Sequence, residues 1–113
     1  MTVYVDNMRA RFRGMIMCHM IADSDDELHA MAARIGMARR WFQNTHSGPH
    51  YDIALPKRAL AVTYGAQEIT QRQCAAMCAR RRVEGKLVDP AHAEAWLRAT
   101  RARRRNPGEV ESS

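Results

Sequence analysis

The chain has 113 residues, which is enough for one domain with a modest hydrophobic core and makes a second domain unexpected. Hydrophobic residues make up 46% of it, which excludes a wholly disordered chain, and charged residues interrupt every apolar stretch before the roughly 20 residues that cross a bilayer. Its three cysteines are an odd number and no secretion signal is recognisable, so we expect a protein of the reducing cytoplasm.

The positive charge is concentrated in the C-terminal part of the chain. Residues 1–70 carry 8 basic and 7 acidic side chains, whereas residues 71–113 carry 10 and 5. This asymmetry favours an acidic partner such as nucleic acid, but arginine-rich helices are also common as solvated surfaces. Both interpretations of the basic region stay open.

Two strands are predicted near the N-terminus. Residues 2–6, "TVYVD", are β-branched and aromatic and end at Asp6, as expected of a short buried strand. Residues 16–22 could form a second strand or an irregular segment, because methionine and cysteine discriminate poorly between the two. Residues 7–14 are too few for a parallel crossover, so such a strand is either antiparallel to the first or not its neighbour.

The central part alternates between predicted helices and strands. Ser24 and Glu27 form a capping box at the start of a helix that Gly36 ends. The segment "RRWFQ" that follows is predicted as a strand, and residues 44–53 as a polar loop. The next helix runs from Pro56 to Gly65.

The C-terminal part contains a short strand candidate, "QEIT", and two helices. Thr70 and Gln73 form a second capping box, which opens a helix to about Arg82 that Gly85 closes. Asp89 and Pro90 suit the start of the last helix, which runs to about Arg105 with Trp96 and Leu97 as apolar anchors.

These elements predict an α/β fold, a small three- or four-stranded, mainly parallel sheet flanked by helices. We expect a single α/β domain at residues 1–85. A basic C-terminal helix at 86–105 would pack on it or extend from it, and 106–113 would form a disordered tail.

Polar side chains are predicted to gather at one edge of this sheet, where ligands bind in open α/β folds. Asp6 follows the first strand, and His50 and Asp52 lie in the loop at 44–53, with His46 as a further candidate. Histidine and aspartate could hold a divalent metal or act as a base with an orienting carboxylate, so these three residues, Asp6, His50 and Asp52, are the candidate catalytic and metal-binding set.

Supporting residues are predicted around this set. Lys57 and Arg58 could hold a phosphate. In an extended segment alternate residues share a face, so Tyr51 should be buried as an anchor, with His50 and Asp52 opposite it and partly exposed.

Several other polar residues have structural interpretations beside a site role. Asp6 could instead make a turn with Asn7. His19 could be a hydrogen-bonded core histidine, and Asp23 could be the residue that starts a helix. Otherwise both, like Gln43, are expected to support the site.

The remaining histidines and cysteines have weaker claims on a site. His29 and His92 are expected at solvated helix positions. Cys74 and Cys78 lie four residues apart, a spacing that suits core packing and could also join a metal site.

The chain resembles domain of unknown function 4031, a small family met in phage and bacterial genomes. The similarity spans about residues 2–73 and rests on "VYVD", "CHMIADSDDELHAMAARIG", "RWFQ", "HYDIALPKRALAVTYGA" and "EIT". It implies a compact phage or prophage accessory protein without an established activity, and therefore no catalytic role to carry over. The family's recurring polar positions correspond here to Asp6, His19, Asp23, Gln43, His50, Tyr51, Asp52, Lys57 and Arg58.

A remoter similarity links "VYVDN" to PIN-like nucleases, whose first strand also ends in a metal-binding aspartate. The later acidic cluster of those nucleases is not evident in this sequence.

Two functions follow as expectations. In the first, the protein is a phage or prophage accessory protein whose His/Asp pocket binds, and could hydrolyse, a phosphate-containing ligand, a nucleotide or nucleic acid, with a divalent metal as the cofactor that such chemistry would use. In the second, it is a non-catalytic module in the host cytoplasm that modulates a host protein or binds nucleic acid through its basic C-terminal region. The arginines expected to make that contact are Arg80, Arg81, Arg82, Arg98, Arg101 and Arg105.

Overall fold

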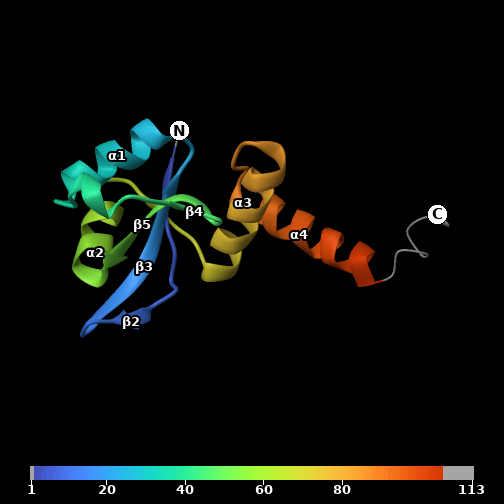
Figure 1. Ribbon diagram of the computed structural model, residues 1–113, viewed down its shortest axis with the longest axis horizontal. Helices are drawn as coiled ribbons and strands as arrows, with labels where there is room; N and C mark the ends of the chain where they lie inside the picture. Colours follow the sequence, from blue (N-terminus) through green and yellow to red (C-terminus); the bar gives the residue numbers. More distant parts are fainter. Residues whose placement is uncertain (1, 106–113) are drawn as a thin grey trace.

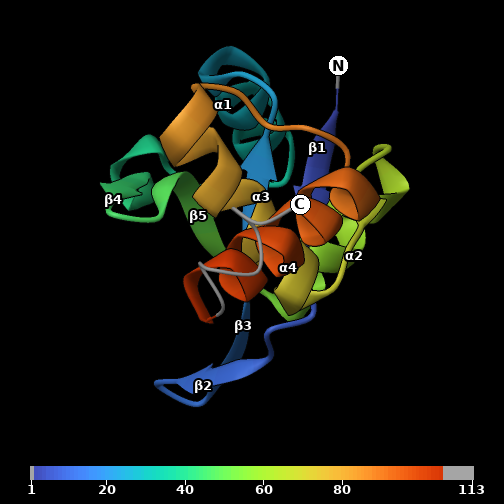
Figure 2. The same cartoon turned by 90° about the vertical axis from the view of Figure 1, so that its right-hand side faces the viewer.

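The computed structural model describes residues 2–105, in which one mixed sheet lies between two pairs of helices (Figure 1). Helices α1 and α2 cover one face of the sheet, and α3 and α4 lie on the other side, in front of it in Figure 2. The strands are β1 (Val3–Val5), β2 (Ala10–Phe12), β3 (Met15–Ala22), β4 (Gln43–Thr45), β5 (Gly48–Ala54) and β6 (Gln67–Glu68). The helices are α1 (Asp25–Arg34), α2 (Leu55–Thr63), α3 (Gln71–Glu84) and α4 (Pro90–Arg105), with a 3₁₀ turn at Arg39–Trp41.

The α/β class is confirmed, but the prediction of a three- or four-stranded, mainly parallel sheet is wrong. The sheet has six strands in the order β4-β5-β3-β1-β6, with β2 paired to β3. Among the described strands only β1 and β6 pair in parallel. Hairpins account for the difference, because β2–β3 and β4–β5 each reverse the chain within a few residues and need no helical crossover.

The segment "RRWFQ" forms a 3₁₀ turn rather than the predicted strand, and only its Gln43 enters β4. Phe42 turns inward, where its ring lies 5.7 Å from that of Tyr51. The predicted loop at 44–53 is largely the β4–β5 hairpin, which turns at His46 and Ser47. Gly48 follows with φ +91, a backbone conformation that favours glycine.

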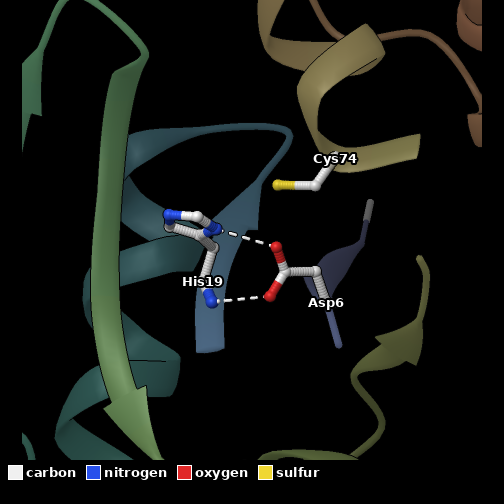
Figure 3. A group of neighbouring side chains, drawn as sticks. All are labelled: Asp6, His19 and Cys74. Atoms are coloured by element: carbon white, nitrogen blue, oxygen red, sulfur yellow. Dashed lines mark hydrogen bonds and ion pairs between the residues drawn. The ribbon is translucent and has the colours of Figure 1, made fainter. Parts of the chain in front are cut away.

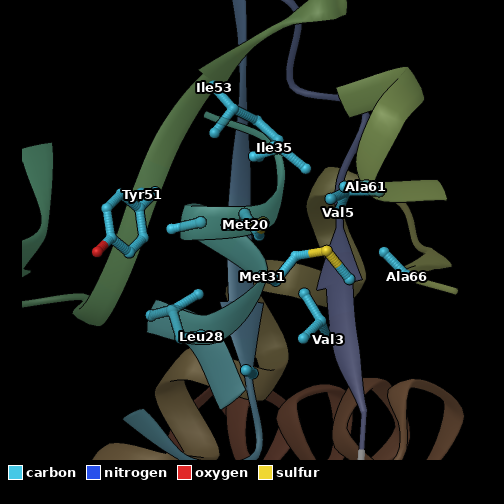
Figure 4. Packing of buried hydrophobic residues seen from close by; sticks show 12 residues of the cluster. Val3, Val5, Met20, Leu28, Met31, Ile35, Tyr51, Ile53, Ala61 and Ala66 are labelled. Carbon is cyan, nitrogen blue, oxygen red and sulfur yellow. The ribbon is translucent and has the colours of Figure 1, made fainter. Parts of the chain in front are cut away.

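The sheet separates two hydrophobic clusters, because successive side chains of a strand point to opposite faces. Met20, Tyr51 and Ile53 pack with Leu28 and Met31 of α1 on the face shown in Figure 4. On the opposite face the second cluster contains Tyr4 and Ile21, with residues of α3 and α4 such as Met77 and Ala93. Polar residues of β3 and β5 that share this second face therefore lie beside α3.

Local capping residues mark the helix ends as predicted, although among the described residues the reciprocal capping box forms at Thr70 and Gln73 and only its serine half forms at Ser24. Ser24 Oγ accepts the Glu27 N–H, and Thr70 and Gln73 form the reciprocal capping box. Gly85 ends α3 in the left-handed conformation at φ +83. In α4, Leu97 packs against the second cluster and Trp96 is half-buried.

None of the described helices is long and apolar enough to cross a membrane. The predicted tail at 106–113 lies outside the described residues.

Candidate functional site

Strand register brings His19, His50 and Asp52 together on the face of the sheet next to α3. His19 lies directly opposite Asp52 in the antiparallel β3–β5 pair, and His50 precedes Asp52 by two residues on β5. Asp52 Oδ1 lies 3.8 Å from His19 Nε2 and 3.7 Å from His50 Nε2. The three side chains therefore converge on one point.

Each of these three side chains also makes a hydrogen bond to another part of the protein, through the atom that points away from the other two. His19 Nδ1 lies 2.8 Å from Asp6 Oδ2, and His50 Nδ1 lies 2.8 Å from the Gly48 carbonyl oxygen. Gln43 Nε2 donates to Asp52 Oδ2 at 3.0 Å. A carbonyl oxygen can only accept, so His50 Nδ1 donates to Gly48, and His50 Nε2 is the ring nitrogen that faces Asp52.

Asp6 is completely buried behind His19, and both of its carboxylate oxygens accept hydrogen bonds (Figure 3). Its Oδ1 accepts the N–H of His19 at 2.7 Å and that of Met8 at 3.1 Å, and its Oδ2 meets the His19 ring. Burial alone would raise the pKa of Asp6, but these hydrogen bonds outweigh burial and hold the pKa below its ordinary value. In return, the hydrogen bond to Asp6 raises the pKa of His19.

Asp52 has one oxygen without a partner. Its Oδ1 is buried and makes no hydrogen bond within residues 2–105, since both imidazoles lie beyond hydrogen-bond distance. Leaving a buried polar atom unpaired is unfavourable by about 1–3 kcal/mol. Such an atom, with the Nε2 atoms of two histidines 3.7 and 3.8 Å away, is suited to a bound cation.

A pocket of about 470 Å³ opens between this face of the sheet, α3 and α4. His19 and His50 line it beside Cys74 and Cys78, and Trp96 forms part of its α4 wall. None of the described residues that line it is acidic, whereas its basic lining residues are Arg82, Arg101 and Arg104. The pocket therefore favours an anionic ligand.

Cys74 and Cys78 are buried in the second cluster and also line the pocket, so the core interpretation does not exclude a site role. The Cys74 thiol points toward His19 and Asp6 (Figure 3), and one ligand atom of each lies within 4.8 Å of the others. The hydrogen bond between the cysteines, together with burial, raises the pKa of Cys74, and the same bond lowers that of Cys78 despite its burial. A metal shared by Asp6, His19 and Cys74 would need oxygens that already accept hydrogen bonds.

The structure does not bring Lys57, Arg58 or Asp23 into this pocket. Arg58 donates to the Asp6 carbonyl oxygen at 2.7 Å and pairs with Glu68 at 2.9 Å, so it supports the backbone at Asp6. Lys57 Nζ lies 3.5 Å from the Gly36 carbonyl oxygen, in a separate groove that Asp52 and Gln43 also line. Asp23 is exposed and accepts the Thr2 N–H beyond the end of β3.

Tyr51 points to the opposite face from His50 and Asp52, as predicted, and is completely buried. Its hydroxyl lies 2.8 Å from His29 Nδ1, so the prediction that His29 is solvated is wrong. The position of His29 in the helical pattern gave no sign of this contact, because its partner Tyr51 lies 22 residues away on β5. Asp52 is half-buried as expected, but His50 is 7% exposed and thus more buried than predicted.

The candidate arginines divide between structural and exposed positions. Arg81 contacts the Ser47 and Pro49 carbonyl oxygens at 3.4 Å, and Arg80 pairs with Glu84 and lies over Trp96. The exposed arginines of α4 from the candidate set are Arg98, Arg101 and Arg105. Of the predicted set, Arg82 and Arg101 are pocket residues. Arg104 was missed because its position depends on how α4 packs on α3.

His46 also lines the pocket, and its carbonyl oxygen accepts from Arg82 at 3.2 Å. His92 lies on the exposed first turn of α4, as predicted, and pairs with Asp89. Of the histidines, only His19, His46 and His50 therefore belong to the pocket lining.

The family comparison agrees with the resemblance seen in the sequence. The sequence model described as "Protein of unknown function (DUF4031)" matches residues 3–81, more than half of the chain. No curated protein and no solved structure matches the chain. The matched segment contains Asp6, His19, His50, Asp52 and Cys74, and therefore the whole His/Asp cluster. The chain thus belongs to the DUF4031 family of proteins of unknown function.

Proposed function

We propose that the protein binds a phosphate-containing ligand, a nucleotide or nucleic acid, in the pocket between the sheet and helices α3 and α4. The charge of the pocket carries this proposal, because Arg82, Arg101 and Arg104 line it and no described lining residue is acidic. Guanidinium groups bind phosphate oxygens through paired N–H donors, which gives both affinity and orientation.

The size and composition of the pocket support a ligand of nucleotide dimensions. Its volume of about 470 Å³ is typical of small-molecule sites. Trp96 contributes an aromatic surface on which a base could stack, and Ile21 and Leu97 contribute apolar surface. The arginines and Trp96 both belong to α3 or α4, so the ligand would lie between these helices and the histidines of the sheet.

Hydrolysis is the reaction that the His/Asp cluster favours at this pocket. A divalent cation beside His19, His50 and Asp52 would activate a water molecule and polarise a phosphoryl oxygen. The pocket arginines would neutralise the charge that develops on the phosphate. His19 and His50 are reached from the pocket, so a phosphate held by the arginines would lie near them.

Binding is tested by fluorescence anisotropy with a labelled nucleotide and with short single-stranded DNA. Arg101→Ala should weaken binding about tenfold, because a charge-assisted hydrogen bond is lost. Arg98→Ala is the matched control, an exposed arginine on the same helix that does not line the pocket, and should have little effect. No binding of either probe to the wild type would overturn the proposal.

The same experiment separates the pocket from a general basic surface. If Arg98→Ala, Arg101→Ala and Arg105→Ala weaken DNA binding equally and affinity falls steeply with salt, the exposed face of α4 binds nucleic acid and the pocket proposal is wrong.

Hydrolysis is tested with Mn²⁺ and bis(p-nitrophenyl) phosphate as a generic diester. Asp52→Asn should abolish turnover while leaving the melting temperature nearly unchanged, because Asp52 is half-buried and the substitution is close to isosteric. His46→Ala, which removes an exposed side chain of the same pocket, should retain turnover. Equal loss in both variants, or no turnover by the wild type, would exclude hydrolysis of this diester at the cluster.

A further inference from the structure

We propose that His19 Nε2, His50 Nε2 and Asp52 Oδ1 bind one divalent transition-metal ion, and that Asp6 is a positioning residue behind His19 rather than a ligand. The inference concerns the cation that the proposed hydrolysis would use, but it is argued from the ligand geometry and tested without any phosphate compound. Failure of phosphate binding therefore leaves it standing, whereas failure of metal binding would remove the proposed hydrolysis and leave phosphate binding at the arginines untouched.

The distances between the three atoms suit a shared ion. Nitrogen and oxygen ligands lie about 2.0–2.2 Å from zinc, so two ligands of one ion are about 3.0–3.7 Å apart over the usual range of angles. The observed separations from Asp52 Oδ1 are 3.7 Å to His50 Nε2 and 3.8 Å to His19 Nε2. One ligand atom of each of the three residues lies within 4.8 Å of the others, so small side-chain movements would bring them around one ion.

The outer contacts of the three residues match those of metal ligands. A metal-bound histidine generally donates its other ring N–H to a carboxylate or a backbone carbonyl oxygen. His19 does so to Asp6 and His50 to the Gly48 carbonyl oxygen, each at 2.8 Å. Asp52 uses Oδ2 for Gln43, which leaves Oδ1 for the ion. These contacts fix the ring orientations before any ion binds.

The inner side of the cluster presents ligand atoms in the neutral form of the histidines, which is the form that binds a metal. In that form Nδ1 of each ring carries the proton, and both Nε2 atoms and Asp52 Oδ1 are acceptors that face one another. Asp52 Oδ1 is also buried and has no hydrogen-bond partner among the described residues. A cation at this point would satisfy all three acceptors at once.

The ligand types determine the class of metal. Two imidazoles and one carboxylate suit Zn²⁺, Mn²⁺, Fe²⁺ or Co²⁺, whereas Mg²⁺ and Ca²⁺ prefer oxygen ligands. Three protein ligands also leave coordination positions for water or for a ligand, as in catalytic rather than structural sites. His19 and His50 line the pocket, so an exchangeable ligand can approach from it.

The alternative set of Asp6, His19 and Cys74 fits less well. It requires His19 Nδ1, which lies 2.8 Å from Asp6 Oδ2, so the metal would have to replace that hydrogen bond. Asp6 Oδ1 already accepts two backbone N–H groups. Cys74 therefore serves as a control for the proposed site.

The experiment titrates the chelator-treated full chain with Co²⁺ and Zn²⁺ by calorimetry, with Mg²⁺ for comparison, and records the visible spectrum of bound Co²⁺. The wild type should bind one Co²⁺ or Zn²⁺ per chain, far more tightly than Mg²⁺. Asp52→Asn and His50→Ala should weaken binding at least 100-fold, and Cys74→Ala and His46→Ala should change it less than about threefold. Far-ultraviolet circular dichroism checks that each variant is folded.

Asp6→Asn tests the positioning role. It should weaken Co²⁺ binding about 10- to 100-fold, as expected for an outer contact, and shift the Co²⁺ absorption bands while keeping one ion per chain. The rival set instead predicts that Cys74→Ala abolishes binding and that Asp52→Asn leaves it intact. That result, or a wild type that binds Co²⁺ no better than Mg²⁺, would overturn the proposal.

Discussion

His19 and Asp52 lie directly opposite each other in the β3–β5 pair, with His19 Nε2 3.8 Å from Asp52 Oδ1. The two residues are 33 positions apart in the printed sequence, so only strand pairing brings them together. Asp6, the residue after β1, holds the far side of the His19 ring, so these contacts join β3, β5 and the end of β1. The stability of this arrangement can be measured apart from any ligand.

Asp6→Ala should strongly destabilise the metal-free protein. The substitution removes a fully buried carboxylate and leaves the N–H groups of His19 and Met8 without their acceptor. We expect the free energy of unfolding to fall by about 3–5 kcal/mol, the usual range when one partner of a buried charged pair is removed. Urea denaturation with a chelator present measures this. If Asp6→Ala lowered the free energy of unfolding no more than Asp52→Asn does, at a half-buried position, the prediction would be contradicted.

Tyr51 should make the protein sensitive to alkaline pH. Burial raises the pKa of Tyr51 above the ordinary value of 10.0, so the unfolded chain loses this proton first. The free energy of unfolding should therefore be unaffected by this group below pH 10.0 and should fall as pH rises toward the pKa of the folded state.

Tyr51→Phe should flatten this alkaline decline, as urea denaturation at several pH values would measure. It should also lower stability at neutral pH by about 1 kcal/mol, because the hydrogen bond to His29 is lost. Burial raises the pKa of Tyr4 too, so some decline should remain. Tyr64→Phe, at an exposed tyrosine, is the control and should leave the profile unchanged.

Thr70→Ala should loosen the start of α3. The threonine accepts the Gln73 N–H at 3.0 Å, and its own N–H donates to the Gln73 side chain at 2.9 Å. Loss of the cap should lower the free energy of unfolding by about 1 kcal/mol. Thr70→Ser keeps the hydroxyl and should stay close to wild type in thermal denaturation; an equal loss in both variants would show that the cap is not the cause.

Gly48→Ala should cost more stability than Gly65→Ala. Both glycines have positive φ values, +91 and +103, so both substitutions strain the backbone. A Cβ at Gly48 would lie 2.5 Å from Arg81 Nη2, whereas one at Gly65 would meet no described atom within 4 Å. Arg81 would then leave the Ser47 and Pro49 carbonyl oxygens.

The difference between the two glycine variants should be about 1 kcal/mol in urea denaturation, the net contribution of a hydrogen bond. In the Arg81→Ala background the two substitutions should have equal effects. A difference that persists in that background would show that Arg81 does not determine it.

The sequence by itself determined the features that depend on neighbouring residues. Ser24 and Thr70 start their helices and Gly85 ends one, because capping is a contact within a single turn. The alternation along residues 50–52 likewise determined that His50 and Asp52 share a face and that Tyr51 lies opposite them.

Only the tertiary structure decided which strands pair and what surrounds the cluster. The sequence allowed an antiparallel pair of β1 and β3, which the structure contains, but it did not predict the two hairpins or the antiparallel β3–β5 pair in which His19 faces Asp52. It also grouped Lys57 and Arg58 with the His/Asp residues, but neither lines the pocket, and it did not single out Arg104, which does. Strand register and helix packing depend on contacts between residues far apart in the chain, which periodicity and capping signals do not encode.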